Sequence, residues 1–234
     1  WVGGSKGLFL RKAGSRTFDL VQNVDVKSML EDHLGHIWIG TWNQGLLHYN
    51  PLEEHFYTYS GINPANSSHV IFQDEAENIW VGTWRYGLVK LIKPYDPEHF
   101  SFQRFTHREG DDLSLLDDII YAIAQDKTSK KLWVGSRSGV SILEDEKNGG
   151  TFTNFMPGNQ QYDLPFNEVN ALICSDDGLM WIGMLGGGVC TVHTGKSRFN
   201  YDPLDCLRKY CPTSSVRSIY QEDNGKLWMG IMGF

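Results

Sequence analysis

The apolar positions of the chain recur in short runs that return at a long, nearly regular interval. The tripeptide Trp-(Val/Ile/Met)-Gly begins at Trp1, Trp38, Trp80, Trp133, Trp181 and Trp228. The mean spacing between successive tryptophans is about 45 residues, which is typical of a four-stranded propeller blade. Each interval therefore predicts one repeated structural unit.

The pattern inside each interval predicts four strands, which we name a to d. Strand a holds an apolar pair three residues apart, as at Val26 and Met29, followed by an Asp or a substitute. Strand b holds Trp-x-Gly, strand c follows a Gly such as Gly45, and strand d is an aromatic run such as residues 56–59. Helical periodicity is nearly absent, so we predict an all-β fold, a β-propeller of four-stranded blades with about five repeats present.

The same repeats carry a family resemblance. The pattern Val-x-x-Ile-x-x-Asp-x-x-Gly-x-Ile-Trp-Ile-Gly-Thr-x-x-x-Gly-Leu, seen best at residues 26–46 and 70–88, resembles the two-component regulator propeller repeat. The later copies depart from it, because Ser136, Met184 and Ile231 replace Thr and Glu77 replaces the turn Gly.

The resemblance implies a function as well as a fold. In that family, such repeats form the periplasmic sensor region of Bacteroides-type hybrid two-component histidine kinases, anchored in the inner membrane. The implied ligand is an oligosaccharide, the implied output is transcription of glycan-use genes, and the full sensor is expected to pair as a homodimer. The kinase, receiver and DNA-binding parts and the membrane helix would lie outside these residues. We therefore expect this fragment not to be an enzyme.

The ends of the sequence suggest an excerpt. The chain begins at Trp1 within a predicted strand b and ends within another, and no signal peptide precedes it. We interpret residues 1–234 as a single, partial propeller region, because a closed ring of five blades would leave the last strand b surplus.

Composition narrows the alternatives. Hydrophobic residues make up 41% and aromatic residues 13% of the chain, which excludes a disordered protein. The formal net charge is 21 − 28 = −7, which argues against a nucleic-acid partner. No apolar run is long enough to cross a membrane. Two other functions stay open: a propeller glycoside hydrolase or sialidase-like enzyme, and a protein-interaction scaffold.

The candidate ligand-binding residues lie between strands b and c. In an up-and-down blade the b–c and d–a loops emerge on one face, where propellers commonly bind ligands; this is an argument from the fold. The b–c loops hold Trp42, Trp84, Arg85, Tyr86 and Arg137. The residues before strand a share that face, and they are Asn66, Ser68, His69, Asp118, Asn167 and Arg217. Aromatic faces stack on sugar rings, and Arg can bind hydroxyl or acidic groups. The alternative is that Trp42 and Trp84 pack between blades.

The tryptophan of each Trp-x-Gly has a different expected role. Because it repeats in every unit, we expect it to be buried as part of the packing. The Gly two residues later is expected to permit close approach between blades or a bulge.

Other chemistry is sparse. His33 and His36 share an a–b turn without a neighbouring Cys or carboxylate cluster, and we interpret them as polar turn residues. The acidic pairs at 111–112 and 117–118 lack a calcium-loop spacing and are expected to lie in a solvated loop or to cap turns. We expect no catalytic residues, no cofactor and no metal.

The four cysteines fall into two pairs. Cys174 and Cys190 lie on strands a and c of one blade, too far apart for an easy disulfide, so they are predicted to be buried small hydrophobes. Cys206 and Cys211 share one loop and are predicted to form a disulfide in an oxidising compartment.

Overall fold

The computed structural model describes residues 1–62, 67–158, 164–193, 200–202 and 215–232. The chain divides into two compact units, residues 1–104 and 105–234. Among the described residues, no helix is long and apolar enough to span a membrane.

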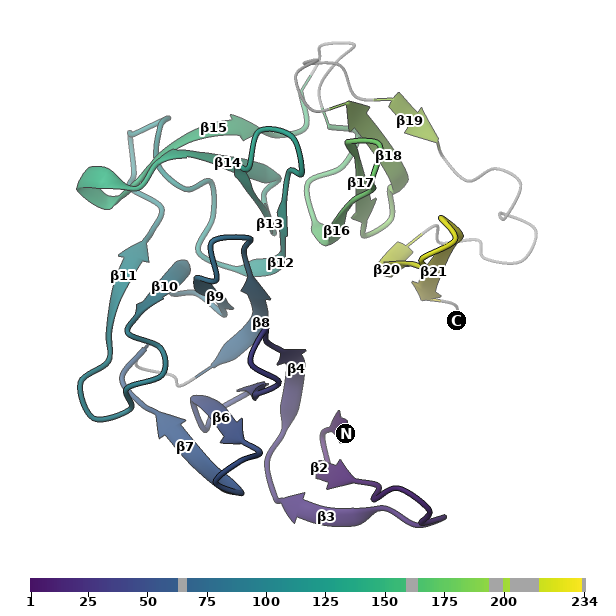
Figure 1. The fold of residues 1–234 in the computed structure, drawn as a ribbon. Helices are drawn as coiled ribbons and strands as arrows, with labels where there is room; N and C mark the ends of the chain where they lie inside the picture. Colours follow the sequence, from purple (N-terminus) through teal and green to yellow (C-terminus); the bar gives the residue numbers. More distant parts are fainter. Residues whose placement is uncertain (63–66, 159–163, 194–199, 203–214, 233–234) are drawn as a thin grey trace. The chain divides into compact units, whose positions relative to one another are not determined.

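The first unit contains three antiparallel sheets whose strands follow one another in sequence order (Figure 1). The strands of these sheets are β1 (Val2–Gly4), β2 (Gly7–Leu10) and β3 (Asp19–Gln22); β4 (Val26–Glu31), β5 (Ile37–Thr41), β6 (Leu46–Asn50) and β7 (His55–Tyr59); and β8 (Ser68–Gln73), β9 (Ile79–Thr83), β10 (Leu88–Ile92) and β11 (Ser101–Phe105). The boundary between the units falls in β11.

The second unit repeats the arrangement. Its strands are β12 (Ile120–Gln125), β13 (Leu132–Ser136), β14 (Val140–Asp145) and β15 (Thr151–Phe155); β16 (Val169–Cys174), β17 (Leu179–Met184), β18 (Gly188–His193) and β19 (Asn200–Asp202); and β20 (Ser215–Gln221) with β21 (Leu227–Met232). The only helical element in the described residues is the 3₁₀ turn η1 (Lys147–Gly149).

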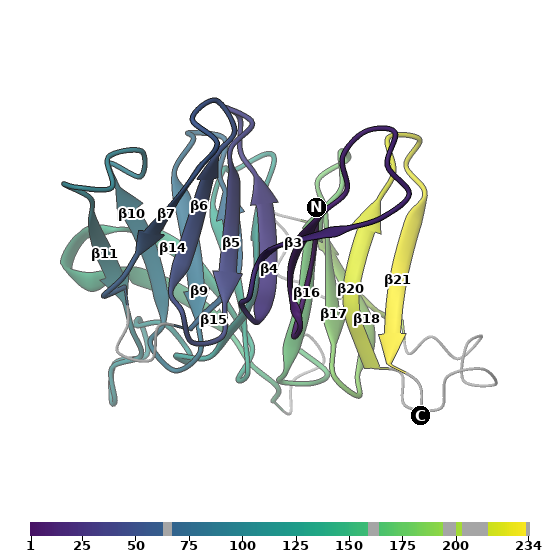
Figure 2. The ribbon, with the colours of Figure 1, turned by 90° about the horizontal axis from the view of Figure 1, so that it is seen from below.

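These sheets confirm the predicted all-β fold of propeller blades. In the best-matched repeat, β4, β5, β6 and β7 are the strands a, b, c and d, and each pairs only with its neighbours in sequence (Figure 2). Each strand a also carries a register shift near its start, between Val26 and Ser28 in β4 and between Val169 and Ala171 in β16. Such a bulge increases the local twist that blades require.

Packing between successive sheets forms the core of each unit. In the first unit, β4 contacts β8, and in the second, β12 contacts β16 and β16 contacts β20. One core cluster of the first unit draws its side chains from β5 to β10, and they include Trp38, Leu46, Tyr59, Ile71, Ile79, Val81 and Val89. A single blade thus has no complete core of its own, which is the physical reason for the repetition.

Three of the repeated tryptophans are fully buried. The exposed fractions of Trp38, Trp80 and Trp133 are 0%, 2% and 4%, as predicted. Trp181 is only half-buried. Our expectation for the last copy was wrong, because Trp228 is 53% exposed. Its described sheet has only two strands, β20 and β21, so fewer neighbours cover the indole.

A carboxylate fixes the indole orientation in three repeats. The Nε1 group of Trp38 donates to Asp32 Oδ2 at 2.8 Å, and the corresponding group of Trp80 donates to Asp74 Oδ2 at 2.8 Å. The third instance joins Trp228 to Glu222 at 2.6 Å. The Asp of the repeat therefore caps the a–b turn and also satisfies the indole N–H, which explains its spacing from Trp.

The glycine of Trp-x-Gly lies where neighbouring sheets approach closely. A Cβ added to Gly40 would lie 2.5 Å from the backbone oxygen of Ser68 in β8. A Cβ on Gly183 would lie 2.7 Å from Val216 Cγ1, and one on Gly135 would lie 2.7 Å from Val169 Cγ1. The prediction of close approach between blades is confirmed.

Candidate functional site

The b–c and d–a loops share one end of each sheet, as the strand order requires. The backbone N–H of Trp42 donates to the carbonyl of Asp25 just before β4, at 2.9 Å. In the second unit, Arg137 N–H donates to Ile119 O at 3.1 Å. These bonds tie the candidate b–c loops to the start of strand a in their own blade.

The residue after Trp-x-Gly builds the b–c loop. The hydroxyl of Thr83 donates to Gly87 O at 2.8 Å and accepts the backbone N–H of Tyr86 at 3.1 Å. The hydroxyl of Thr41 donates to Gly45 O at 2.7 Å in the same way. The Thr hydroxyl therefore closes the loop through backbone groups, and the side chains at the loop tip take no part in these hydrogen bonds.

Two predicted tryptophans meet on this end of the first unit. The ring centroids of Trp42 and Trp84 lie 5.4 Å apart, and His69 lies 5.7 Å from Trp84 and 6.4 Å from Trp42. We call these three rings the tryptophan cluster. Lys27 Nζ lies 5.1 Å from the Trp42 ring and pairs with Asp25 Oδ1 at 3.1 Å.

The rings of the tryptophan cluster pack against one another, and part of their surface is exposed to solvent. Trp42 is 38% exposed, while Trp84 is half-buried. The alternative in which both rings are buried between blades is therefore too simple for Trp42, since a large part of its surface faces solvent. A partly exposed indole held by neighbouring rings is a suitable platform for stacking.

Arg85 adopts an unusual backbone conformation. Its φ is +73°, in the left-handed region that costs a branched or long side chain free energy. The corresponding residue two blades later is Gly186, with φ +78°. A loop that needs this geometry would be less strained with Gly, yet it carries an exposed Arg beside the half-buried Tyr86.

Arg137 belongs to the second unit and is described separately. Its side chain is exposed, and its Nε donates to Asp117 Oδ2 at 3.2 Å. Ser138 Oγ donates to the same oxygen at 2.6 Å. Asp117 is buried, so it orients the Arg137 side chain from below.

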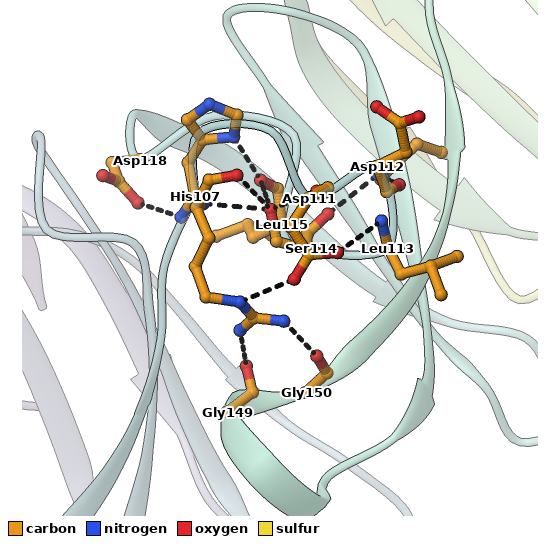
Figure 3. A network of polar contacts seen from close by, with 11 residues as sticks. His107, Asp111, Asp112, Leu113, Ser114, Leu115, Asp118, Gly149 and Gly150 are labelled. Atoms are coloured by element: carbon orange, nitrogen blue, oxygen red, sulfur yellow. Dashed lines mark hydrogen bonds and ion pairs between the residues drawn. The ribbon is translucent and has the colours of Figure 1, made fainter.

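A polar network orders the d–a connection between β11 and β12 (Figure 3). Arg108 Nε donates to Asp111 Oδ2 at 2.8 Å, and its two terminal nitrogens donate to Gly149 O at 3.0 Å and Gly150 O at 3.2 Å. The hydrogen bond from Arg108 is the largest cause that lowers the pKa of Asp111. A cavity of about 400 Å³ lies beside this loop and is lined by residues that include His107, Leu113, Leu116, Phe152, Asn154 and Met156.

Three of the four acidic side chains accept backbone N–H groups in their loops, in agreement with the expected capping role. Asp111 Oδ1 accepts the N–H of Leu113, and Asp117 Oδ1 accepts the N–H of Ile119 at 2.8 Å. Asp118 Oδ1 accepts the backbone N–H of His107 at 2.8 Å.

The interpretation of the histidine pair is right for His33 and wrong for His36. His33 is exposed and contacts Gln73 and Glu77 of the next sheet. His36 is buried and contacts His48, because the register of β5 and β6 places His48 opposite Trp38. Spacing within one turn cannot reveal a partner that arrives from another strand.

The cysteine predictions have separate outcomes. Cys174 and Cys190 are free and buried, as predicted, and burial raises the pKa of Cys190 to about 12. Cys206 and Cys211 lie outside the described residues, so their disulfide stays a prediction.

Comparisons with known proteins agree with the repeat. Residues 20–43 match the family model of the two component regulator propeller, which confirms the resemblance inferred from the repeats. None of the curated protein sequences matches the chain.

Solved structures extend the likeness to nearly the whole chain. One is described as the extracellular domain of the hybrid two component system BT3049 from B. thetaiotaomicron; it is 25% identical, with a TM-score of 0.68 over 88% of this chain and 27% of that one. Another, from the system BT4673 of the same organism, is 17% identical, with a TM-score of 0.73 over 98% and 29%. Virginiamycin B lyase from Staphylococcus aureus is 11% identical, with a TM-score of 0.69 over 97% and 71%.

These likenesses differ in what they support. The structures of the BT4673 domain and of virginiamycin B lyase are less than 25% identical to the chain and show the propeller fold alone. The chain spans less than a third of the length of either Bacteroides structure. The BT3049 structure, at 25% identity, is an extracellular domain, which is consistent with an extracytoplasmic location for this region.

Proposed function

We propose that the chain is a non-catalytic part of the periplasmic sensor region of a hybrid two-component histidine kinase, and that it binds an oligosaccharide. The family match and the Bacteroides extracellular domains support the sensor role. Inner-membrane anchoring, a kinase part and control of glycan-use genes belong to the same proposal. The observation that carries ligand binding is the exposed tryptophan cluster at the b–c end of the first unit.

The cluster has the chemistry that a sugar ligand requires. Trp42 offers an exposed apolar face for the C–H groups of a sugar ring, and Trp84 and His69 fix its tilt. Because the rings already contact one another, little side-chain entropy is lost on binding. Arg85 and Tyr86, in the same loop as Trp84, supply donors for hydroxyl or acidic groups. Arg137 is proposed to serve the equivalent loop of the second unit.

The conformation of Arg85 supports a functional reason for that residue. Left-handed backbone at a non-glycine residue costs about 1–3 kcal/mol and persists where function or surroundings demand it. Gly186 shows that a glycine is compatible with this loop position. Stability alone therefore does not account for Arg at position 85, whereas ligand recognition does.

The experiment is a screen of the 234-residue chain on a glycan array, followed by calorimetric titration with the retained oligosaccharide. Trp42→Ala should weaken binding about tenfold, which corresponds to about 1.4 kcal/mol. Arg85→Gly should also weaken binding while the free energy of unfolding stays equal or rises, because the backbone strain is relieved.

Trp228→Ala is the matched control, since Trp228 is a similarly exposed tryptophan on another sheet. It should leave affinity unchanged. Retention of no oligosaccharide by the folded chain, or equal affinity of the Trp42 and Arg85 variants, would contradict the proposal. Release of product from a labelled oligosaccharide would favour the glycosidase alternative instead.

A further inference from the structure

A second cluster lies at the opposite end of the first unit, where the a–b and c–d loops emerge. The side chains of Asp32, His36 and His48 are all buried, and one ligand atom from each lies within 4.8 Å of the others. His36 Nδ1 and His48 Nε2 are 2.9 Å apart and share one hydrogen. The three residues come from the a–b turn and from β6, so the sheet register assembles them.

Burial and hydrogen bonding shift the pKa values of two of these groups. Burial, and then the neighbouring His36, lower the pKa of His48 to about 4, so this imidazole is neutral at physiological pH. Burial alone would raise the pKa of Asp32, but hydrogen bonds from Trp38, the His36 backbone and Tyr95 lower it below its usual value. The geometry places one carboxylate and two imidazoles close enough for one ion to contact all three.

One polar atom in the cluster is left over. His48 is only 3% exposed, and its Nδ1 is buried with no hydrogen-bond partner in the described part of the chain. Aromatic rings surround this imidazole, with Trp38 stacked at 4.2 Å and Tyr57, Tyr59 and Tyr95 at 5.9–6.1 Å. This atom shows that hydrogen bonding inside the cluster is incomplete, although it is not the nitrogen that faces His36.

The next blade shows that the fold does not need these imidazoles. Asp74 and Trp80 repeat the carboxylate–indole bond of Asp32 and Trp38 at the same distance. There Asn78 takes the place of His36, and Lys90 lies opposite Trp80, with its Nζ 5.1 Å from the indole ring. The hydrogen bond between Asp and Trp therefore forms without the two imidazoles, which among the described sheets occur only in the blade of β4 to β7.

We propose that Asp32, His36 and His48 form a binding site for a divalent transition-metal ion of the Zn²⁺ type. Two imidazoles and one carboxylate are a common donor set for this ion, with a fourth position left for water. Ligand nitrogens about 2.0–2.1 Å from a tetrahedral ion lie about 3.3 Å apart, so the two rings must separate by a few tenths of an ångström.

Binding requires two existing contacts to break. The hydrogen bond between the two imidazoles is lost, and its hydrogen moves to the other nitrogen of the ring that carries it. One hydrogen bond to Asp32 is lost as well. The Asp32 carboxylate accepts four hydrogen bonds: from the N–H groups of Leu34 and His36, from Trp38 and from the Tyr95 hydroxyl. The Tyr95 bond is one of the two longest, at 3.0 Å, and comes from a separate loop. We assign the Tyr95 hydroxyl as the donor that the ion displaces from Oδ2. The proposal does not depend on oligosaccharide binding, because the tryptophan cluster lies at the other end of the sheets.

The test is titration of the EDTA-stripped chain with Co²⁺, followed by its visible absorption and then by displacement with Zn²⁺. One ion per chain with the intense spectrum of four-coordinate Co²⁺ is expected. The double variant H36N/H48K, which copies Asn78 and Lys90 of the next blade, should bind at least about a hundredfold more weakly. Tyr95→Phe should bind several-fold more tightly, because the competing donor is gone.

His33→Asn is the matched control, since His33 lies in the same turn but is exposed. It should leave the spectrum and affinity unchanged. The proposal is overturned if H36N/H48K keeps the wild-type spectrum, or if the wild-type chain gives only the weak spectrum of six-coordinate ions. Should the double variant fail to fold, Zn²⁺-dependent shifts of the wild-type histidine ring signals decide, because His36 and His48 must respond and the other histidines must not.

Discussion

Replacement of Gly40 by Ala tests how the sheets of the first unit are held together. Gly40 follows Trp38 in β5, and an added Cβ would lie 2.5 Å from both Ser68 O and Ser28 Oγ. Ser28 Oγ is the end of a rotatable side chain, whereas Ser68 O is backbone of β8. The methyl group therefore has to push the next sheet away.

The magnitude follows from that distance. Ordinary contact begins near 3.4 Å, so β8 must move by about 0.9 Å at this point. Overpacking of this kind costs about 1–3 kcal/mol, and the reduced freedom of the unfolded chain returns about 0.5–1 kcal/mol. A net loss of about 1–2 kcal/mol lowers the Tm of a chain of this size by about 2–8 °C.

The assay is urea unfolding and thermal melting followed by tryptophan fluorescence. Gly4→Ala is the matched control, since a Cβ added to Gly4 would have no atom within 4 Å and the φ of this residue is not positive. It should be neutral or slightly stabilising. If Gly40→Ala and Gly4→Ala unfold at the same urea concentration, close sheet approach is not the reason for glycine in the repeat.

Three further predictions concern titration, reactivity and loop order. In EDTA-containing buffer, the free energy of unfolding should fall by about 3 kcal/mol as the pH drops from about 6.5 to about 4. Over this range His48 binds a proton in the unfolded chain but stays neutral in the folded chain. Denaturant titrations of His48→Gln should show a smaller change of the unfolding free energy with pH. Cys174 and Cys190 should resist iodoacetamide in the folded chain and react after unfolding, as peptide mass spectrometry can show, since burial raises both thiol pKa values. Asp117→Ala should cost about 1–3 kcal/mol in urea unfolding and release the Arg137 side chain, because a buried acceptor of three hydrogen bonds is lost; an unchanged midpoint would show that the turn holds without it.

The fold was predictable because its signal repeats. Strand order, the burial of Trp38 and the tight contact at Gly40 all follow from a pattern that occurs in every blade, so errors in one copy are corrected by the others. Trp228 was mispredicted because burial depends on how many strands cover a sheet, which the tripeptide does not encode.

The candidate sites were only partly predictable, because they depend on features outside the repeat. The contact between Trp42 and Trp84 could be anticipated from their shared loop position. His36 and His48 are twelve residues apart in sequence, and their contact depends on the register between β5 and β6. The positive φ of Arg85 has no sequence signature, since glycine is the residue that normally announces that conformation.

The way Thr41 and Thr83 close their loops has an evolutionary consequence. The hydroxyl donates to the carbonyl of the glycine beyond the tip, so the side chains of the three tip residues take no part in the hydrogen bonds that close the loop. Those tip residues can be exchanged at little cost to folding, one blade at a time. A receptor built this way can acquire a new specificity by small steps, while the framework that would relay the signal stays the same.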